Sequence, residues 1–191
     1  MAVGLGNPGP EYARSRHNLG AMVVALLAER HGERLRHSRN DHALVGEAKV
    51  DGRRLALAFP QTYMNDSGLA VRSLVRRFGI EDLARLVIVQ DELDLPTGVV
   101  RVKAGGGLAG HNGLRSIEAH LHDRGFTRVR LGIDKAPGRN RRPGDGIGHV
   151  LSPPSKTEQE DIDVAVATAA DAVEHILVQG VEAAMNLYNS R

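Results

Sequence analysis

The unit that decides the fold lies in residues 2–32, which read AVGLGNPGPEYARSRHNLGAMVVALLAERHG. The apolar residues 2–5 are typical of the end of a short buried strand, and a loop rich in glycine and proline follows as far as Asn18. Residues 19–31 then carry apolar side chains at helical spacing, and Gly32 fits a helix C-cap. The stretch therefore predicts a strand, a long loop and a helix, which is the building unit of an α/β fold.

The rest of the chain continues to alternate strands with helices. Strands are predicted at residues 43–50, 53–59, 86–90, 99–103 and 127–133, and helices at 68–78, 113–122, 155–179 and 181–188. Asp51-Gly52 between the first two of these strands is a strong hairpin signal, and the Pro/Gly/Arg-rich stretch 137–148 is typical of a mobile loop. We expect an α/β fold in which a single domain, residues 1–191, forms a twisted mixed β-sheet flanked by α-helices on both faces.

Composition excludes several classes of protein. The 191 residues contain no cysteine, which excludes disulfide frameworks, thiolate zinc sites and cysteine nucleophiles. No apolar run approaches the roughly 20 residues of a membrane helix, and the first residues have neither a basic head nor a long apolar stretch. We expect a cytoplasmic protein without a signal peptide or a membrane partner. A protein without cysteine cannot form the disulfides that are common in oxidising compartments, so its composition suits the reducing cytosol.

Charge is distributed unevenly along the chain. Residues 1–150 hold 23 Lys or Arg against 16 Asp or Glu, whereas residues 151–191 hold 2 against 7. Residues 101–142 alone hold ten basic residues against three acidic ones. This density fits a polyanionic partner, although scattered arginines also simply solubilise loops. Because aromatic residues make up only 3% of the chain, contacts with a nucleic acid would involve phosphates rather than stacked bases.

Two glycine-rich loops match nucleotide-binding motifs only in part. Gly4-Leu5-Gly6-Asn7-Pro8-Gly9 has the G-x-G-x-x-G spacing, but a dinucleotide loop passes directly into a helix whose amides bind pyrophosphate. Here Pro8 and Pro10 lack an N–H, and helical spacing starts only near residue 19. The loop 105–110 is not followed by the Lys-Ser or Lys-Thr pair of a Walker sequence. The first loop is better explained as a stiff support for Asn7.

His17 and Asp91 are the candidate acid–base pair. Asp91 follows the apolar run 86–90, at the position where α/β sheets build their sites. A buried aspartate that accepts a hydrogen bond from one histidine nitrogen makes the other nitrogen a better base. No nucleophile stands out, since Ser67 lacks a G-x-S-x-G elbow, so the attacking species is water. Two alternatives stay open: Asp91 could join Glu92 and Asp94 in an acidic turn or a Mg²⁺ site, and Asn112 could serve only as a helix N-cap.

Four blocks of sequence together resemble bacterial peptidyl-tRNA hydrolase. They are residues 4–12 with Arg16-His17-Asn18, then residues 60–68, residues 91–96, and Gly105-Gly106-Gly107 with Gly110-His111-Asn112-Gly113. The resemblance implies a monomeric α/β enzyme of the cytoplasm that needs no cofactor or metal. It implies hydrolysis of the ester that joins a peptide to the 3′ end of tRNA, with the tRNA acceptor stem and the attached peptide as partners, so that tRNA is recycled.

The resemblance also assigns roles to single residues. His17 matches the general base, and Asp91 matches the carboxylate that orients it. Asn7, Asn65 and Asn112 match asparagines that hold peptide groups, position the water and stabilise the oxyanion. Tyr12 and Met64 match residues of the cleft for the terminal nucleotide and peptide, and Lys103 and Arg130 match a basic pair that grips the 5′-phosphate.

This chain departs from the family pattern at a few positions. Gln90 stands where a histidine is common, and Leu108-Ala109 replace a smaller, more polar pair, which bears on the mobility of residues 104–110. Asp134 stands where relatives often have glycine and would weaken phosphate attraction near Arg130. The first strand also begins a few residues late. Two rival functions remain: a non-catalytic RNA-binding relative, and a Mg²⁺-dependent phosphodiesterase that uses Asp91, Glu92 and Asp94.

Overall fold

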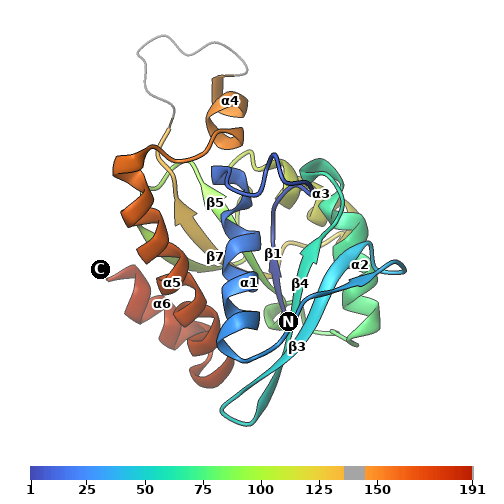
Figure 1. Ribbon diagram of the computed structural model, residues 1–191. Coiled ribbons are helices and arrows are strands. Elements are labelled where there is room, and N and C mark those ends of the chain that lie inside the picture. Colours follow the sequence, from blue (N-terminus) through green and yellow to red (C-terminus); the bar gives the residue numbers. More distant parts are fainter. Residues whose placement is uncertain (136–144, 191) are drawn as a thin grey trace.

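A seven-stranded sheet in the order β2-β3-β4-β1-β5-β7-β6 forms the centre of the computed structural model, which describes residues 1–135 and 145–190 (Figure 1). The strands are β1 (Ala2–Gly4), β2 (Arg36–Ser38), β3 (Ala43–Val50), β4 (Arg53–Pro60), β5 (Val87–Glu92), β6 (Val100–Ala104) and β7 (Thr127–Gly132). Strands β4, β1, β5 and β7 run parallel, while β3, β2 and β6 pair antiparallel with their neighbours. The predicted mixed sheet is confirmed.

Helices cover both faces of this sheet. The described helices are α1 (Leu19–Arg30), α2 (Ser67–Arg77), α3 (Asn112–Leu121), α4 (Asp145–Leu151), α5 (Lys156–Gln179) and α6 (Val181–Asn189), with short 3₁₀ helices η1 (Arg16–Asn18), η2 (Met64–Asp66) and η3 (Leu83–Arg85). Helices α1, α5 and α6 share one apolar core with the sheet, and α2 and α3 share the other. None of the described helices is long and apolar enough to cross a bilayer.

The connections of the sheet create a switch point between β1 and β5. After β1 the chain turns through α1 toward β3 and β4, and after β4 it crosses through α2 to β5 on the other side. The loops that follow β1, β4 and β5 therefore meet at the carboxyl ends of the parallel strands, which is where open α/β sheets bind ligands. Helix α4 lies at this same end of the molecule (Figure 1).

A pair of glycines brings α1 unusually close to the sheet. A Cβ on Gly4 would lie 2.0 Å from the Gly20 carbonyl oxygen, and a Cβ on Gly20 would lie 2.2 Å from the Val89 oxygen. This proximity lets the Ala21 N–H of the helix donate to the Leu5 oxygen at 3.1 Å. Gly4 thus allows the backbones of β1 and α1 to pack closely. This packing gives a structural explanation for the first glycine of the G-x-G-x-x-G pattern.

The structure corrects several element boundaries. Strand β5 extends to Glu92, so Asp91 lies inside the strand rather than in the loop after it. Most of the predicted loop 137–148 falls outside the described residues, but its last residues were wrongly predicted because α4 begins at Asp145. The strand β2 was not predicted, since its three residues are polar and mostly exposed and give no apolar alternation.

The glycine-to-aspartate departure at position 134 has a backbone explanation. Asp134 has a φ of 54°, a left-handed conformation that glycine adopts without strain and that aspartate tolerates better than most residues. Its Oδ2 accepts a hydrogen bond from the Thr97 N–H at 2.9 Å. The effect of this carboxylate on phosphate binding stays a prediction.

We predict that Gly20→Ala destabilises the fold by about 2 to 3 kcal/mol, because the added methyl would overlap backbone atoms of β5 and of the residue after β1. Chemical denaturation of the purified variant measures the change. Gly148→Ala is the matched control, since a Cβ on this glycine of α4 would meet nothing within 4 Å. A Gly20→Ala protein as stable as the parent would contradict the close helix-to-sheet contact.

Candidate active site

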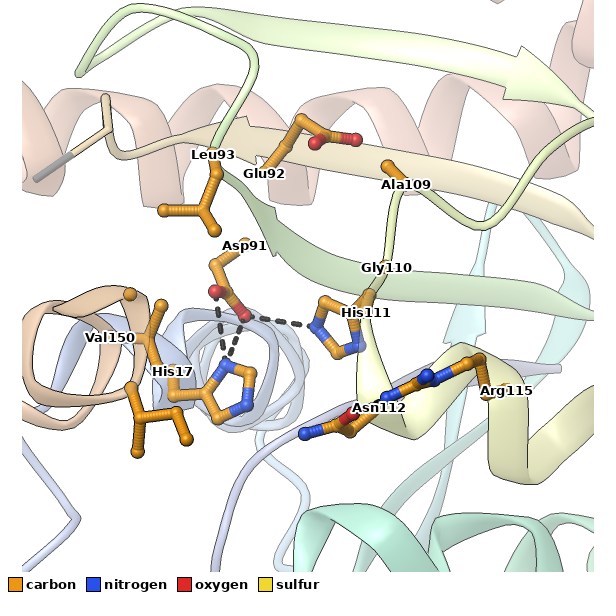
Figure 2. A pocket seen from close by; sticks show the side chains of 12 residues that line it. His17, Asp91, Glu92, Leu93, Ala109, Gly110, His111, Asn112, Arg115 and Val150 are labelled. Atoms are coloured by element: carbon orange, nitrogen blue, oxygen red, sulfur yellow. Dashed lines mark hydrogen bonds and ion pairs between the residues drawn. The ribbon is translucent and has the colours of Figure 1, made fainter. Parts of the chain in front are cut away.

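His17 sits in η1, immediately before α1, with its ring against the end of β5. Its Nδ1 lies 2.8 Å from Asp91 Oδ1 and 3.0 Å from Oδ2 (Figure 2). An ionised carboxylate only accepts hydrogen bonds, so Nδ1 carries the proton and donates it. The neutral ring therefore has its lone pair on Nε2, which points away from Asp91 toward the Asn112 side chain (Figure 2). This is the tautomer that a histidine base requires.

Asp91 is held by two imidazoles. Its side chain is only 2% exposed, and besides His17 it contacts His111, whose Nε2 lies 3.1 Å from Oδ1. Burial by itself would raise the pKa of Asp91, but the electrostatic attraction and the hydrogen bonds of His17 and His111 outweigh it and hold this pKa below its usual range. The carboxylate is thus ionised at neutral pH in a site that excludes most water.

Arg16 anchors the turn that carries His17. Its guanidinium donates to Ser152 Oγ and the Pro153 oxygen, both at 2.8 Å, and to Glu158 Oε2 at 2.7 Å. The Arg16 N–H also donates to the Ser152 oxygen. These bonds fasten η1 to the segment between α4 and α5, so His17 cannot shift without moving that segment. The sequence prediction missed this role, because an arginine beside a histidine carries no local signal for it.

Asn7 is positioned by Asn18. The Asn7 N–H donates to Asn18 Oδ1, and Asn18 Nδ2 donates to the Asn7 oxygen, both at 2.9 Å. The Asn7 side chain then reaches the next loop, where its Oδ1 accepts a hydrogen bond from the Met64 N–H at 2.8 Å. Since the oxygen is engaged, the amide N–H₂ of Asn7 is the end that can bind another group.

A cavity of about 370 Å³ opens beside the two imidazoles. His17, Asp91, His111 and Asn112 form its polar wall, and Leu93, Ile147 and Val150 form its apolar wall. Ile147 and Val150 come from α4, which is held over the site in part by the hydrogen bond from His149 Nε2 to the Ile133 oxygen. The size and mixed lining are typical of a small-ligand site.

His111, and not Asn112, caps helix α3. His111 Nδ1 accepts from the N–H groups of Gly113 and Leu114, at 3.1 and 3.4 Å. The explanation of Asn112 as an N-cap is therefore wrong. Asn112 is exposed, and its Oδ1 accepts a hydrogen bond from Arg115. This contact directs the amide nitrogen of Asn112 toward His17 (Figure 2).

Other predicted site residues lie outside the lining of this cavity. Asn65 is exposed on η2 beside the buried Met64, and Tyr12 is half-buried in the loop after β1. Lys103 and Arg130 project from the same face of β6 and β7, but they are not directly opposite one another: Lys103 faces Arg128 in the register. The roles of these residues stay predictions.

Arg128 supports the second glycine loop from below. The residue is 1% exposed, and its two terminal nitrogens donate to the oxygens of Gly107 and Gly105, at 2.7 and 2.5 Å. The pKa of Arg128 is lowered, because burial disfavours its charge and Arg130 lies near. The sequence indicated this arginine only as surface charge and gave no signal for its role as an internal support.

Gln90, which stands where a histidine is common in the family, is fully buried in β5 and does not line the cavity.

The three carboxylates of the proposed Mg²⁺ site do not converge. Glu92 points to the opposite face of the sheet from Asp91 and lies 3.7 Å from Arg130 Nη1, while Asp94 is exposed and pairs with Lys135. Among the described residues, only His17, Asp91 and His111 bring three potential metal-ligand atoms within 4.8 Å of one another. Their hydrogen-bond distances place N–H protons between nitrogen and oxygen, so we describe them as a hydrogen-bonded group rather than as metal ligands.

Comparisons with known proteins agree with one another. The family model for peptidyl-tRNA hydrolase matches residues 1–191. The peptidyl-tRNA hydrolases of Rhodococcus erythropolis and Nocardia farcinica are each 46% identical over 186 residues, which is 97% of this chain and 95% and 94% of theirs. The crystal structure of peptidyl-tRNA hydrolase from Acinetobacter baumannii is 40% identical and superposes with a TM-score of 0.89 over 99% of this chain and 93% of that one.

We predict that Glu158→Gln removes a pH-dependent part of the stability. The Arg16 hydrogen bond, with smaller help from Ser155, lowers the pKa of Glu158 from 4.5 to about 2. Because the folded state lowers this pKa, the stabilisation is present above pH 4.5 and is lost as the pH falls toward 2. With a side chain 27% exposed, the contribution is about 1 to 2 kcal/mol after allowance for solvent screening.

Urea unfolding at pH 6 and pH 3 measures this effect. Glu158→Gln is expected to be less stable than the parent at pH 6 and closer to it at pH 3, since glutamine keeps the capping box of α5 without the charge. The exposed Glu160, two residues along α5, provides the control variant Glu160→Gln. An equal stability gap at both pH values would argue against the Arg16–Glu158 contact.

Proposed function

The chain belongs to the peptidyl-tRNA hydrolase family and hydrolyses the ester bond between peptide and tRNA, and we propose that His17 is its general base and Asp91 the carboxylate that orients this base. The observation that carries the proposal is the pair of contacts from His17 Nδ1 to the Asp91 oxygens, at 2.8 and 3.0 Å. They leave the Nε2 lone pair beside the cavity, where a water molecule and the ester can approach it.

In this mechanism His17 Nε2 takes a proton from water while the water oxygen attacks the ester carbonyl. Asp91 stabilises the imidazolium that forms, since its charge lies against Nδ1. The tetrahedral intermediate then collapses, the bond to the ribose oxygen breaks, and His17 returns the proton to that oxygen. The products are a carboxylic acid on the peptide, which releases its proton to solvent to become a carboxylate, and a free hydroxyl on the tRNA.

The asparagines supply neutral donors around the reacting carbonyl. Asn112 directs its amide nitrogen toward His17, which supports its role as a donor to the developing oxyanion. Asn7 has its oxygen bound to Met64 N–H, so its N–H₂ binds a carbonyl of the peptide, while Asn65 on η2 contacts the substrate farther from the reacting bond. Amide side chains suit this task because they bind peptide groups of any sequence. Tyr12 and Met64 shape the cleft for the terminal nucleotide and peptide.

The tRNA acceptor stem lies along the basic face of β6 and β7 in this proposal. Lys103 and Arg130 grip its 5′-phosphate, supported by their common face in the sheet. The enzyme works as a monomer in the cytoplasm, with residues 1–191 as one peptidyl-tRNA hydrolase domain. The cysteine-free composition supports the cytoplasmic location, because it suits a reducing compartment.

We predict that His17→Ala lowers the rate of hydrolysis of N-acetylated aminoacyl-tRNA by at least about 10²-fold, the typical contribution of a general base. Binding of tRNA should persist, because the alanine leaves the basic face intact. Turnover and filter binding measured on the same preparation separate the two effects. His37→Ala, in the exposed strand β2, is the matched control and should behave like the parent.

The same assay separates the rival functions. A parent protein that binds tRNA but never releases the peptide would identify a non-catalytic relative. Activity abolished by EDTA and restored by Mg²⁺ would favour the carboxylate-based phosphodiesterase. Hydrolysis that persists in EDTA and disappears in His17→Ala is the result expected here, whereas undiminished turnover in that variant would overturn the assignment of His17.

We predict that Lys103→Ala weakens binding of the substrate and makes it less dependent on salt. Each lost phosphate contact should reduce the slope of log K against log [salt] by roughly 0.7 to 0.9. Titrations at several salt concentrations measure this slope. Lys49→Ala is the control, because Lys49 is exposed at the β3–β4 hairpin, and an unchanged slope in Lys103→Ala would count against the phosphate contact.

A further inference from the structure

The protonation of His111 follows from its role as a helix cap. Its Nδ1 receives two backbone N–H groups at the start of α3, from Gly113 at 3.1 Å and Leu114 at 3.4 Å. A nitrogen that accepts hydrogen bonds cannot carry a proton of its own in the ring plane. The proton of the neutral ring is therefore on Nε2, and protonation of both nitrogens would displace the two helix amides.

Among the residues that the structure describes, Asp91 supplies the acceptor for the Nε2 proton of His111. Asp91 Oδ1 lies 3.1 Å away, and the same oxygen accepts the Nδ1 proton of His17 at 2.8 Å. The two rings lie close, with centroids 5.0 Å apart, and the His111 side chain is only 7% exposed. Asp91 thus lies between two histidines. His17 faces the cavity with its second nitrogen, whereas the second nitrogen of His111 accepts the hydrogen bonds at the start of α3.

We propose that His111 is a positioning residue for the hydrolysis, which holds the Asp91 carboxylate in the orientation that His17 requires and shares its negative charge. The inference rests on the proposed function, in which His17 is the base. His111 does not touch the reacting atoms. It acts through Asp91, and it ties the orientation of this carboxylate to the start of α3, the same turn that carries Asn112.

Sharing of the carboxylate has a consequence for the base. A carboxylate with a single imidazole partner directs all of its charge to that partner and favours its protonated form. A second N–H donor draws part of this charge away from His17, so removal of the donor would direct more of the charge to the His17 ring. The donor also prevents the carboxylate from rotating away from His17 Nδ1 during the proton transfer.

Other charged groups around the three side chains have partners of their own. Within the part of the chain that the structure describes, Glu92 on β5 lies near Arg130, and Arg115 on α3 is bound to Asn112. Arg16 on η1 is bound to Glu158 on α5, and His149 on α4 is bound to the Ile133 oxygen. None of these side-chain contacts involves the His111 side chain, so differences between variants at this position report on the contact with Asp91 and on the helix cap.

Two substitutions separate the contact with Asp91 from the helix cap. His111→Asn places an oxygen where Nδ1 lies and keeps the cap, since asparagine is a favoured N-cap residue, but it removes the donor to Asp91. His111→Gln does the reverse: its amide nitrogen is the same number of bonds from Cα as Nε2 and can still donate to Asp91, whereas the cap is lost. A merely structural role would make the glutamine variant the more affected one.

The test is the pH dependence of kcat/KM on N-acetylated aminoacyl-tRNA, with thermal unfolding of each variant in parallel. We expect the acidic limb for His111→Asn to move to higher pH by about 0.5 to 1 unit, with kcat at neutral pH lowered several-fold, KM little changed and the melting temperature retained. We expect His111→Gln to keep the acidic limb of the parent and to melt at a lower temperature.

Other results would overturn the proposal. They are an acidic limb in His111→Asn that coincides with that of the parent, or a limb that moves equally in both variants. Nitrogen NMR of the parent gives a second test, because a protonated Nδ1 on His111 contradicts the argument directly. Failure of the proposed function looks different: His17→Ala would then be active, whatever the position of the acidic limb in the His111 variants.

Discussion

The close contact between α1 and the centre of the sheet is the constraint on which the site depends. Because neither Gly4 nor Gly20 has a Cβ, the helix backbone touches β1 and β5, and the Ala21 N–H bonds directly to the Leu5 oxygen. The turn η1 precedes this helix without a break, so its position is set by the same contact. A helix at an ordinary distance from the sheet would carry His17 out of reach of Asp91. The glycine pair therefore sets the geometry of the His17–Asp91 contact without taking part in it.

Asp91 shows how the protein tolerates a charge in its interior. A buried carboxylate without partners would be strongly destabilising or would become protonated. Here two N–H groups from imidazoles on different elements satisfy it, and each imidazole has a second function, in the cavity for His17 and at the start of α3 for His111. The site is consequently a junction of η1, β5 and α3, and a change in any of the three elements affects the other two through one carboxylate.

Buried and paired arginines explain much of the basic charge that the sequence first associates with nucleic acid. Among the basic residues of the stretch 101–142, Arg128 supports the glycine loop, Arg101 donates to the Tyr188 oxygen, Arg115 holds Asn112 and Arg124 pairs with Glu118. Arginine suits such internal roles because its planar group can donate to several carbonyl oxygens at once. A count of charges along the chain therefore overstates the charge that faces a tRNA.

The sequence alone determined the alternation of strands and helices, the Asp51-Gly52 hairpin and, through four motif blocks, the pairing of His17 with Asp91. These features depend on local periodicity, turn preferences and residue identity, which are visible along the chain. It did not predict β2, whose polar residues have no pattern, or α4, whose start lies in a glycine-rich stretch. Only the tertiary structure decided the contacts of His111, Arg128 and Arg16. The last of these reaches Glu158 across 142 positions, and no local pattern can encode which distant groups a long side chain meets once the chain has folded.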